Sequence, residues 1–161
     1  MASLNLKAME KLSKNVSYKE GVYSITADRL GLENKPNEEQ LANMKTIAEK
    51  VFQPLRQWVG GPVKINSFFR SPELNKAIGG SSKSQHCHGQ AIDIDDTFGK
   101  RTNAEMFTYI KEMLDFDQMI WEFGDDNNPN WVHVSYVSPE ENRNRCLKAY
   151  KENGKTKYMV I

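Results

Sequence analysis

Two of the three histidines of this chain lie with two carboxylates in one short segment, Ser84-Gln85-His86-Cys87-His88-Gly89-Gln90-Ala91-Ile92-Asp93-Ile94-Asp95. The third histidine lies in Trp131-Val132-His133-Val134-Ser135. Two imidazoles and one carboxylate form a common ligand set of catalytic zinc sites, which leave a fourth tetrahedral position open. The two segments therefore predict a metal site made by His86, Asp93 and His133.

The composition is that of an ordinary globular protein. The chain has 161 residues, of which 39% are hydrophobic and 27% charged, so it is long enough to bury a sizeable core. The net charge is +1, and basic and acidic residues are interspersed. This balance gives no reason to expect nucleic acid or an anionic membrane as a partner. We predict a single domain over residues 1–161, acting as a monomer.

Targeting signals are not recognisable in the sequence. Residues 1–7 lack the apolar region of a signal peptide, and no run of about 18 apolar residues predicts a membrane-spanning helix. We therefore expect synthesis in the cytoplasm without membrane insertion. If the protein acts outside the cytoplasm, another factor must export or release it.

The two cysteines, Cys87 and Cys146, are predicted to be reduced. Cys87 stands between two histidines and must be considered as a ligand. In an extended segment its side chain points away from the face of His86 and His88, and thiolate ligands usually occur in CxxC pairs. Cys87 is therefore predicted to lie behind the ligands or in the core.

Capping residues and apolar side chains at steps of three and four positions predict four helices. The second contains Pro54, which has no N–H to donate to the carbonyl of Lys50 and should kink the helix. The predicted helices cover residues 18–30, 38–59, 72–78 and, after Asn103 as its cap, 104–114.

Strands are predicted where apolar and polar residues alternate. Two of them flank a turn-rich loop and should form an antiparallel hairpin. A second hairpin is predicted at the end of the chain, with Asn153-Gly154 in its turn. The predicted strands cover residues 63–68, 91–95, 118–123, 131–137, 145–150 and 156–161.

Three motifs resemble those of zinc peptidase family M15, which includes D-Ala-D-Ala carboxypeptidases and hedgehog-like metallopeptidases. Ser84-x-His86-x-x-Gly89-x-Ala91-x-Asp93 matches the SxHxxGxAxD motif of that family, and Trp131-Val132-His133 matches its WxH. Upstream, Ser67-Phe68-Phe69-Arg70-Ser71 matches its S-x-x-R-S segment. The resemblance covers about residues 18–136 and is strongest to the compact phage and bacterial branch that degrades cell walls. An HExxH helix, the commonest protease zinc motif, is absent from the sequence.

The resemblance implies an α+β fold, in which helices pack against a small antiparallel sheet that carries one zinc ion on His86, Asp93 and His133. It also implies a metallopeptidase that hydrolyses peptidoglycan stem peptides as a D-Ala-D-Ala carboxypeptidase or an L-Ala-D-Glu endopeptidase. Such an enzyme would act on the cell wall after release by another factor, like an endolysin, or within a phage particle. The alternative is a non-catalytic zinc-containing binding or structural module of the same fold.

The general base departs from the family pattern. Many members carry an acidic residue three positions before the last histidine ligand, where this chain has Asn130, which cannot accept a proton. Glu122 lies on the preceding strand, and the hairpin should bring it opposite the WxH segment. Along that strand Phe123 is expected to face away from Glu122. We predict Glu122 as the base, with Asp125 and Asp126 as alternatives.

Four further residues have predicted roles beside the metal. Arg70 follows an apolar strand and either binds the substrate carboxylate or developing oxyanion or forms a surface ion pair. Asp95, on the strand face of Asp93, either orients a histidine ligand or is solvated. Trp131 is predicted to support the ligands, and Ser84 either binds substrate or shapes the turn. His88 replaces His86 if the register slips.

Overall fold

A mixed sheet forms the centre of the structure, a computed structural model that describes residues 10–161. Within these residues the sheet has six strands in the order β3-β4-β6-β5-β7-β8, and β1 and β2 form a separate two-stranded sheet. The α+β class is thus confirmed. The strands are β1 Lys11–Ser13, β2 Val16–Ser17, β3 Lys64–Ser67, β4 Ala91–Asp95, β5 Gln118–Glu122, β6 Trp131–Ser135, β7 Arg145–Glu152 and β8 Lys155–Val160.

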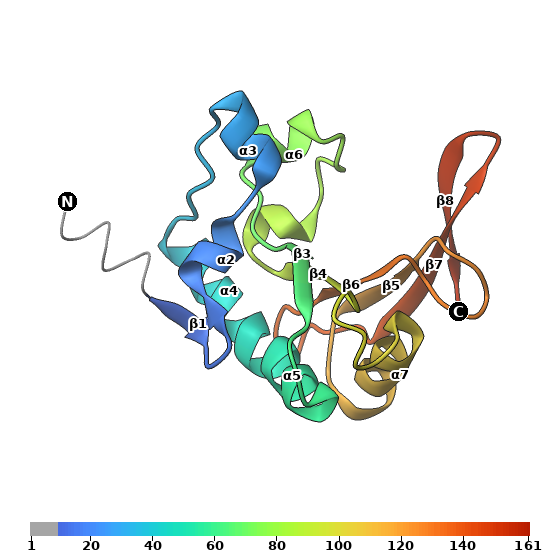
Figure 1. Cartoon of the computed structure of the whole chain (residues 1–161). Helices are drawn as coiled ribbons and strands as arrows, with labels where there is room; N and C mark the ends of the chain where they lie inside the picture. The colour runs from blue at the N-terminus through green and yellow to red at the C-terminus, as the bar shows by residue number, and fades with distance from the viewer. Residues whose placement is uncertain (1–9) are drawn as a thin grey trace.

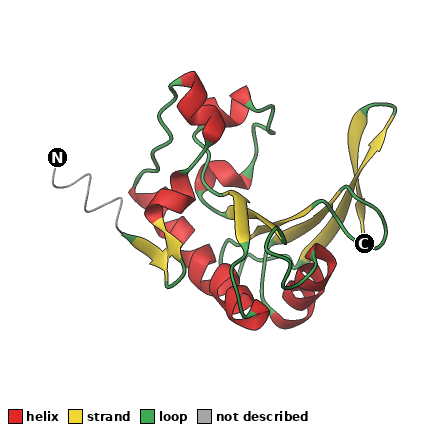
Figure 2. Ribbon diagram, in the orientation of Figure 1, coloured by secondary structure: helices red, strands yellow, loops and turns green. Residues whose placement is uncertain are grey.

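Both predicted hairpins are confirmed. β5 and β6 pair antiparallel, as do β7 and β8, whose turn contains Asn153 and Gly154 at positive φ. The sequence did not indicate that β7 pairs parallel to β5 and so joins the last hairpin to the sheet. This hairpin reaches beyond the body of the molecule (Figure 1). In Figure 2 the strands lead from the helices to this projecting hairpin.

Two short helices replace the predicted helix over residues 18–30, so that prediction was wrong. They are α2 (Tyr18–Val22) and α3 (Ile25–Leu30). Between them Tyr23 is extended, and Ser24 caps α3 by accepting a hydrogen bond from the backbone N–H of Ala27. A second capping residue inside the segment therefore restarts the helix.

The long predicted helix is three consecutive segments, α4 (Glu38–Ile47), the π-helical η1 (Ala48–Phe52) and α5 (Gln53–Val59). The π-helical turn ends two residues before Pro54, where the regular hydrogen-bond ladder lacks a donor. The remaining helices are α6 (Pro72–Ala77), the 3-10 helix η2 (Gln85–His88) and α7 (Asn103–Met113). No helix within residues 10–161 is long and apolar enough to cross a membrane.

The two faces of the sheet have different environments. On one face, side chains of β4 and β6 join the main core, to which the long helix and α7 contribute Met44, Val51, Leu55, Met106 and Ile110. The register pairs Asp93 with His133 and His133 with Ile120, and these residues belong to the other face. Two of the predicted metal ligands, Asp93 and His133, therefore lie on the face opposite the main core.

Candidate metal centre

His86 lies on η2, not in the extended run that the sequence suggested. Ser84 caps this 3-10 turn by accepting a hydrogen bond from the backbone N–H of His86 at 3.2 Å. Gly89 ends it at φ +72, and a Cβ there would lie 2.4 Å from the carbonyl oxygen of Gln40. Only glycine fits both this backbone conformation and this close approach. Gly89 thus lets the turn lie directly against α4.

Helix α4 holds this turn through two side-chain amides. Gln40 Nε2 donates to the carbonyl of Cys87 at 3.0 Å, and Asn43 Nδ2 donates to the carbonyl of His88 at 2.9 Å. No role at the site was predicted for this helix. Gln40 and Asn43 were the signal in the sequence that could have indicated this contact. Amide side chains on a helix can hydrogen-bond to the backbone of a neighbouring segment.

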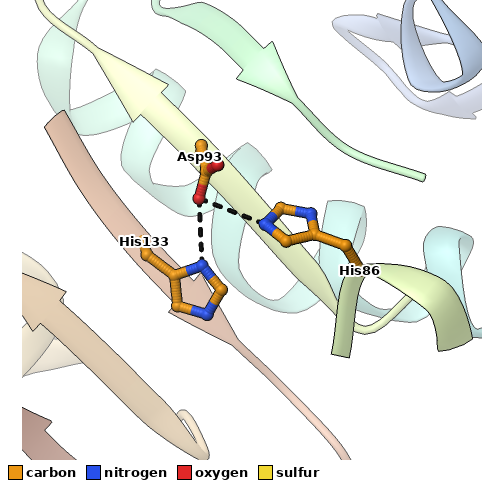
Figure 3. Close-up of side chains that lie close together, drawn as sticks. All are labelled: His86, Asp93 and His133. Atoms are coloured by element: carbon orange, nitrogen blue, oxygen red, sulfur yellow. Dashed lines mark hydrogen bonds and ion pairs between the residues drawn. The ribbon is translucent and has the colours of Figure 1, made fainter. Parts of the chain in front are cut away.

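The three predicted ligands converge on one point (Figure 3). His86 Nε2 lies 3.2 Å from Asp93 Oδ1, and His133 Nδ1 lies 2.9 Å from the same oxygen. The three ligand atoms lie within 4.8 Å of one another, and the exposed His88 does not take part. The structure thus brings together residues from η2, β4 and β6 that are up to 47 positions apart in sequence, since 133 − 86 = 47.

These distances fit a metal ion. Zinc bonds to nitrogen and oxygen are about 2.0–2.2 Å long, which places neighbouring tetrahedral ligands about 3.3 Å apart. The two distances to Asp93 Oδ1 are close to this value, so small side-chain movements would seat an ion. Two neutral imidazoles and one carboxylate match the zinc ligand chemistry, and the cluster could therefore hold a metal.

The protonation states of the cluster also suit a metal. Burial lowers the pKa of His86 against the opposing pull of Asp93, which favours the neutral imidazole that ligates metals. Burial alone would raise the pKa of Asp93. The charges and hydrogen bonds of His86 and His133 outweigh this effect and hold that pKa well below its usual range. Asp93 is therefore an anionic ligand.

Backbone and side-chain partners orient two of the ligands. The carbonyl of Phe68 accepts a hydrogen bond from His86 Nδ1 at 2.6 Å, which leaves Nε2 for the metal. Arg70 Nη2 donates to Asp93 Oδ2 at 3.2 Å, so only Oδ1 faces the histidines. Nε and Nη1 of Arg70 donate to Ser67 Oγ and Asn75 Oδ1. Sequence reasoning missed Phe68, because it contributes only a main-chain carbonyl.

Glu122 lies in the same cavity as the cluster and is 8% exposed. Its pKa is raised to about 7, mainly by burial and also by the charge of Asp93, against the opposing charges of His133 and Arg70. A carboxyl group that titrates near neutral pH can both accept and return a proton.

Phe123 does not face away from Glu122, so that expectation was wrong. Its φ is +58, an uncommon conformation for a bulky residue that costs on the order of 1–3 kcal/mol. This reversal ends the strand alternation at Glu122 and turns the Phe123 ring onto the site face. There it packs against Ile120, Leu147 and Ala149.

A cavity of about 600 Å³ surrounds the cluster. Its polar side includes Arg70, Ser84 and the three ligands. Its apolar side includes Ile120, Phe123, Trp131, Leu147 and Tyr158. The cavity thus places charged groups and apolar side chains within reach of one bound molecule.

Other predicted residues have partners outside the cluster. Asp95 accepts hydrogen bonds from Asn103 and Asn66 rather than from a histidine. Trp131 lines the cavity, and its ring lies 5.6 Å from that of Phe123. Both cysteines are free thiols, and neither belongs to the cluster.

The two alternative bases lie in the loop between β5 and β6. Asp125 accepts hydrogen bonds from the backbone N–H groups of Asn127 and Asn128, and Asp126 forms an ion pair with Lys148. Glu122, by contrast, lines the cavity that contains the ligands. Among the three carboxylates, the geometry therefore favours Glu122.

A His-Asp-His cluster, of which His86 and Asp93 are buried, with a nearby carboxyl group in a cavity on a sheet face defines a candidate metal-dependent hydrolase. The model of the family described as Peptidase M15 matches residues 14–135, which is more than half of the 161 residues. The chain therefore belongs to the Peptidase M15 family. A search of curated proteins found no match.

Proposed function

We propose that the protein is a zinc metallopeptidase that hydrolyses peptide bonds in peptidoglycan stem peptides. Family membership supports a peptidase. The observation that carries the proposal is the buried Glu122 in one cavity with His86, Asp93 and His133. A metal site without catalysis needs no carboxyl group beside it with a pKa near neutrality.

His86 Nε2, Asp93 Oδ1 and His133 Nδ1 would hold the ion. When bound, zinc supplies a Lewis acid that polarises a carbonyl and lowers the pKa of water. Phe68 and Arg70 fix the orientation of His86 and Asp93 through the other side-chain atoms of these ligands. The side chains of His86 and Asp93 are thus already oriented in the metal-free protein.

Glu122 acts as the general base and then as the general acid. Its carboxylate takes the proton of the attacking water and delivers it to the nitrogen of the leaving amine. A pKa of about 7 makes both transfers feasible near neutral pH. Asn130, at the usual acidic position, takes no part in proton transfer.

Arg70 stabilises negative charge on the substrate. Three of its donor groups are committed to Ser67, Asn75 and Asp93. A guanidinium group has five N–H bonds, so two remain for a carbonyl or carboxylate oxygen in the cavity. Ser84 lines the cavity as well as capping η2, and it contributes a hydroxyl to the same side.

The second candidate is a zinc-containing binding or structural module without catalysis. Asn130 favours it, because the family position that commonly holds the acidic residue is neutral here. The same substrate would then bind without being cleaved.

Peptide release from purified peptidoglycan and from a stem pentapeptide distinguishes the two functions. We expect zinc-loaded wild type to release new peptide ends, and mass spectrometry of those ends identifies the bond. Chelation and His133→Ala should abolish release, and added zinc should restore only the chelated wild type. Wild type that holds one zinc per chain and releases nothing from any wall type would overturn the enzymatic proposal.

A further inference from the structure

The site face of the sheet carries a small apolar cluster separate from the main core. It consists of Ile120, Leu147 and Ala149, with Phe123 packed against them. Tyr158 joins it along the cavity, and we call Ile120, Phe123, Leu147 and Tyr158 the apolar wall. Pockets that bind organic ligands combine such apolar surface with a few polar groups.

Register places the apolar wall next to the proposed base. Trp131 pairs with Glu122, Glu122 with Ala149, and Ala149 with Tyr158, so these four residues form one row across four strands. Residues in such a row share a face of the sheet. The fully buried methyl of Ala149 separates two long side chains, those of Glu122 and Tyr158. Tyr158 thus stands two strands beyond the proposed base, on the side away from the strands β4 and β6 that carry Asp93 and His133.

Tyr158 is available to a ligand. Its side chain is 55% exposed although it lines the cavity. Burial and the charge of Glu122 both raise the pKa of its phenol, which stays neutral at physiological pH. A neutral aromatic ring at a cavity mouth buries apolar surface when a ligand covers it.

The backbone conformation of Phe123 also indicates that this part of the cavity binds a ligand. Its positive φ turns a large ring into the cavity instead of the main core. Unfavourable backbone conformations persist where the surrounding structure requires them, and they concentrate at functional sites.

We propose that the apolar wall, with Tyr158 at its outer end, is a subsite for an apolar side chain of the peptide substrate, next to the bond that is cut. This inference rests on the proposed function, because it identifies which part of the same substrate the cavity selects. The ionised carboxylate of Glu122 beside the apolar wall disfavours an acidic side chain there. Strand β8, which supplies Tyr158, lies outside the residues matched by the family model.

Peptide binding to zinc-loaded protein tests the subsite without relying on turnover. The probe is the stem pentapeptide, and Kd is measured by calorimetry in a Glu122→Gln background. We expect Tyr158→Ala to raise Kd about tenfold and Tyr158→Phe to change it less than about twofold, because the ring and not the hydroxyl makes the contact. Tyr150→Ala is the matched control, since Tyr150 lies on the same hairpin but faces the other side.

A double-mutant cycle of peptide and protein variants identifies which peptide side chain contacts Tyr158. Among peptides with one alanine replaced by glycine, one should bind about threefold or more weakly to the parent protein, and this difference should shrink in Tyr158→Ala. An unchanged Kd in Tyr158→Ala with full zinc content would overturn the subsite.

The outcomes also separate this inference from the proposed function. If the peptide binds but wild type never cleaves it, the peptidase proposal is wrong. The Kd of Tyr158→Ala relative to the parent protein then still shows whether the apolar wall contacts the peptide. If wild type cleaves the peptide and Tyr158→Ala has an unchanged KM, only the subsite is wrong. If no stem peptide binds at all, both are wrong.

Discussion

Adjacent residues of β4 and β6 point to opposite faces of the sheet, and the two faces have different roles. Ile92, Val132 and Val134 are fully buried in the main core, whereas Asp93 and His133 face the cavity. Adjacent positions therefore serve stability on one face and chemistry on the other. The comparison teaches that a substitution should affect mainly the property of its own face, and this can be tested residue by residue.

The largest effect is expected on the cavity face at Glu122. Glu122→Gln removes the proposed base but keeps the size of the side chain, so kcat should fall by about 10²- to 10⁴-fold with one zinc still bound. Steady-state hydrolysis of a stem peptide and metal analysis measure both quantities. Asp125→Asn is the control and should leave kcat unchanged. Retained activity in Glu122→Gln together with loss in Asp125→Asn would move the base to the loop.

The core face should respond in stability rather than in metal binding. Ile92→Ala leaves a cavity in a fully buried position and should lower the free energy of unfolding by about 2–5 kcal/mol. Its zinc affinity should remain near that of wild type. His133→Ala should show the opposite pattern, with zinc binding lost and metal-free stability lowered less than in Ile92→Ala, because Asp93 keeps its contacts with His86 and Arg70. Urea unfolding and zinc titration would contradict the comparison if both variants lost both properties equally.

Metal-free stability should depend on pH through Glu122. Its folded-state pKa is about 7 against an ordinary value of 4.5, so the folded chain retains a proton that the unfolded chain has released. The resulting stabilisation is full below pH 4.5 and disappears as pH rises through 7, and it amounts to about 3 kcal/mol at most. Unfolding of the chelated protein across this range should show wild type losing stability relative to Glu122→Gln. A flat difference between the two proteins would contradict the environment assigned to Glu122.

The smallest effect is expected at Arg70, which supports a ligand instead of contacting the metal. Arg70→Lys cannot reproduce three simultaneous contacts to Ser67, Asn75 and Asp93. Zinc affinity should fall about 10- to 100-fold, as for other partners of metal ligands. Arg101→Lys is the control, because Arg101 lies over Trp58 and pairs with Glu105 away from the cavity. Unchanged zinc affinity in Arg70→Lys would show that Asp93 needs no such partner.

The sequence predicted the centre of the molecule better than its edges. Alternation in residues 91–95 and 131–135 is a local signal, and the scarcity of histidine made its placement informative. Register between β4 and β6 then follows from burying the apolar face. The family motifs supplied the remaining constraint on which residues share the site.

Other features depended on interactions that no local pattern encodes. The parallel pairing of β7 with β5 arises from tertiary packing, and the reversal at Phe123 breaks strand alternation at one residue. Phe68 contacts His86 through its main-chain carbonyl, which every residue has. The identity of residue 68 therefore gives no sign of this contact. The restart of the helix at Ser24, by contrast, had a local signal, because serine is a preferred capping residue.

Zinc titration of the metal-free chain tests the central claim most directly. His86→Ala removes a proposed ligand, while His88→Ala removes an exposed imidazole from the same turn and is the matched control. We predict one tightly bound zinc per chain in wild type and His88→Ala, and loss of that binding in His86→Ala. Absence of binding in wild type, or equal loss in both variants, would contradict a metal centre formed by His86, Asp93 and His133.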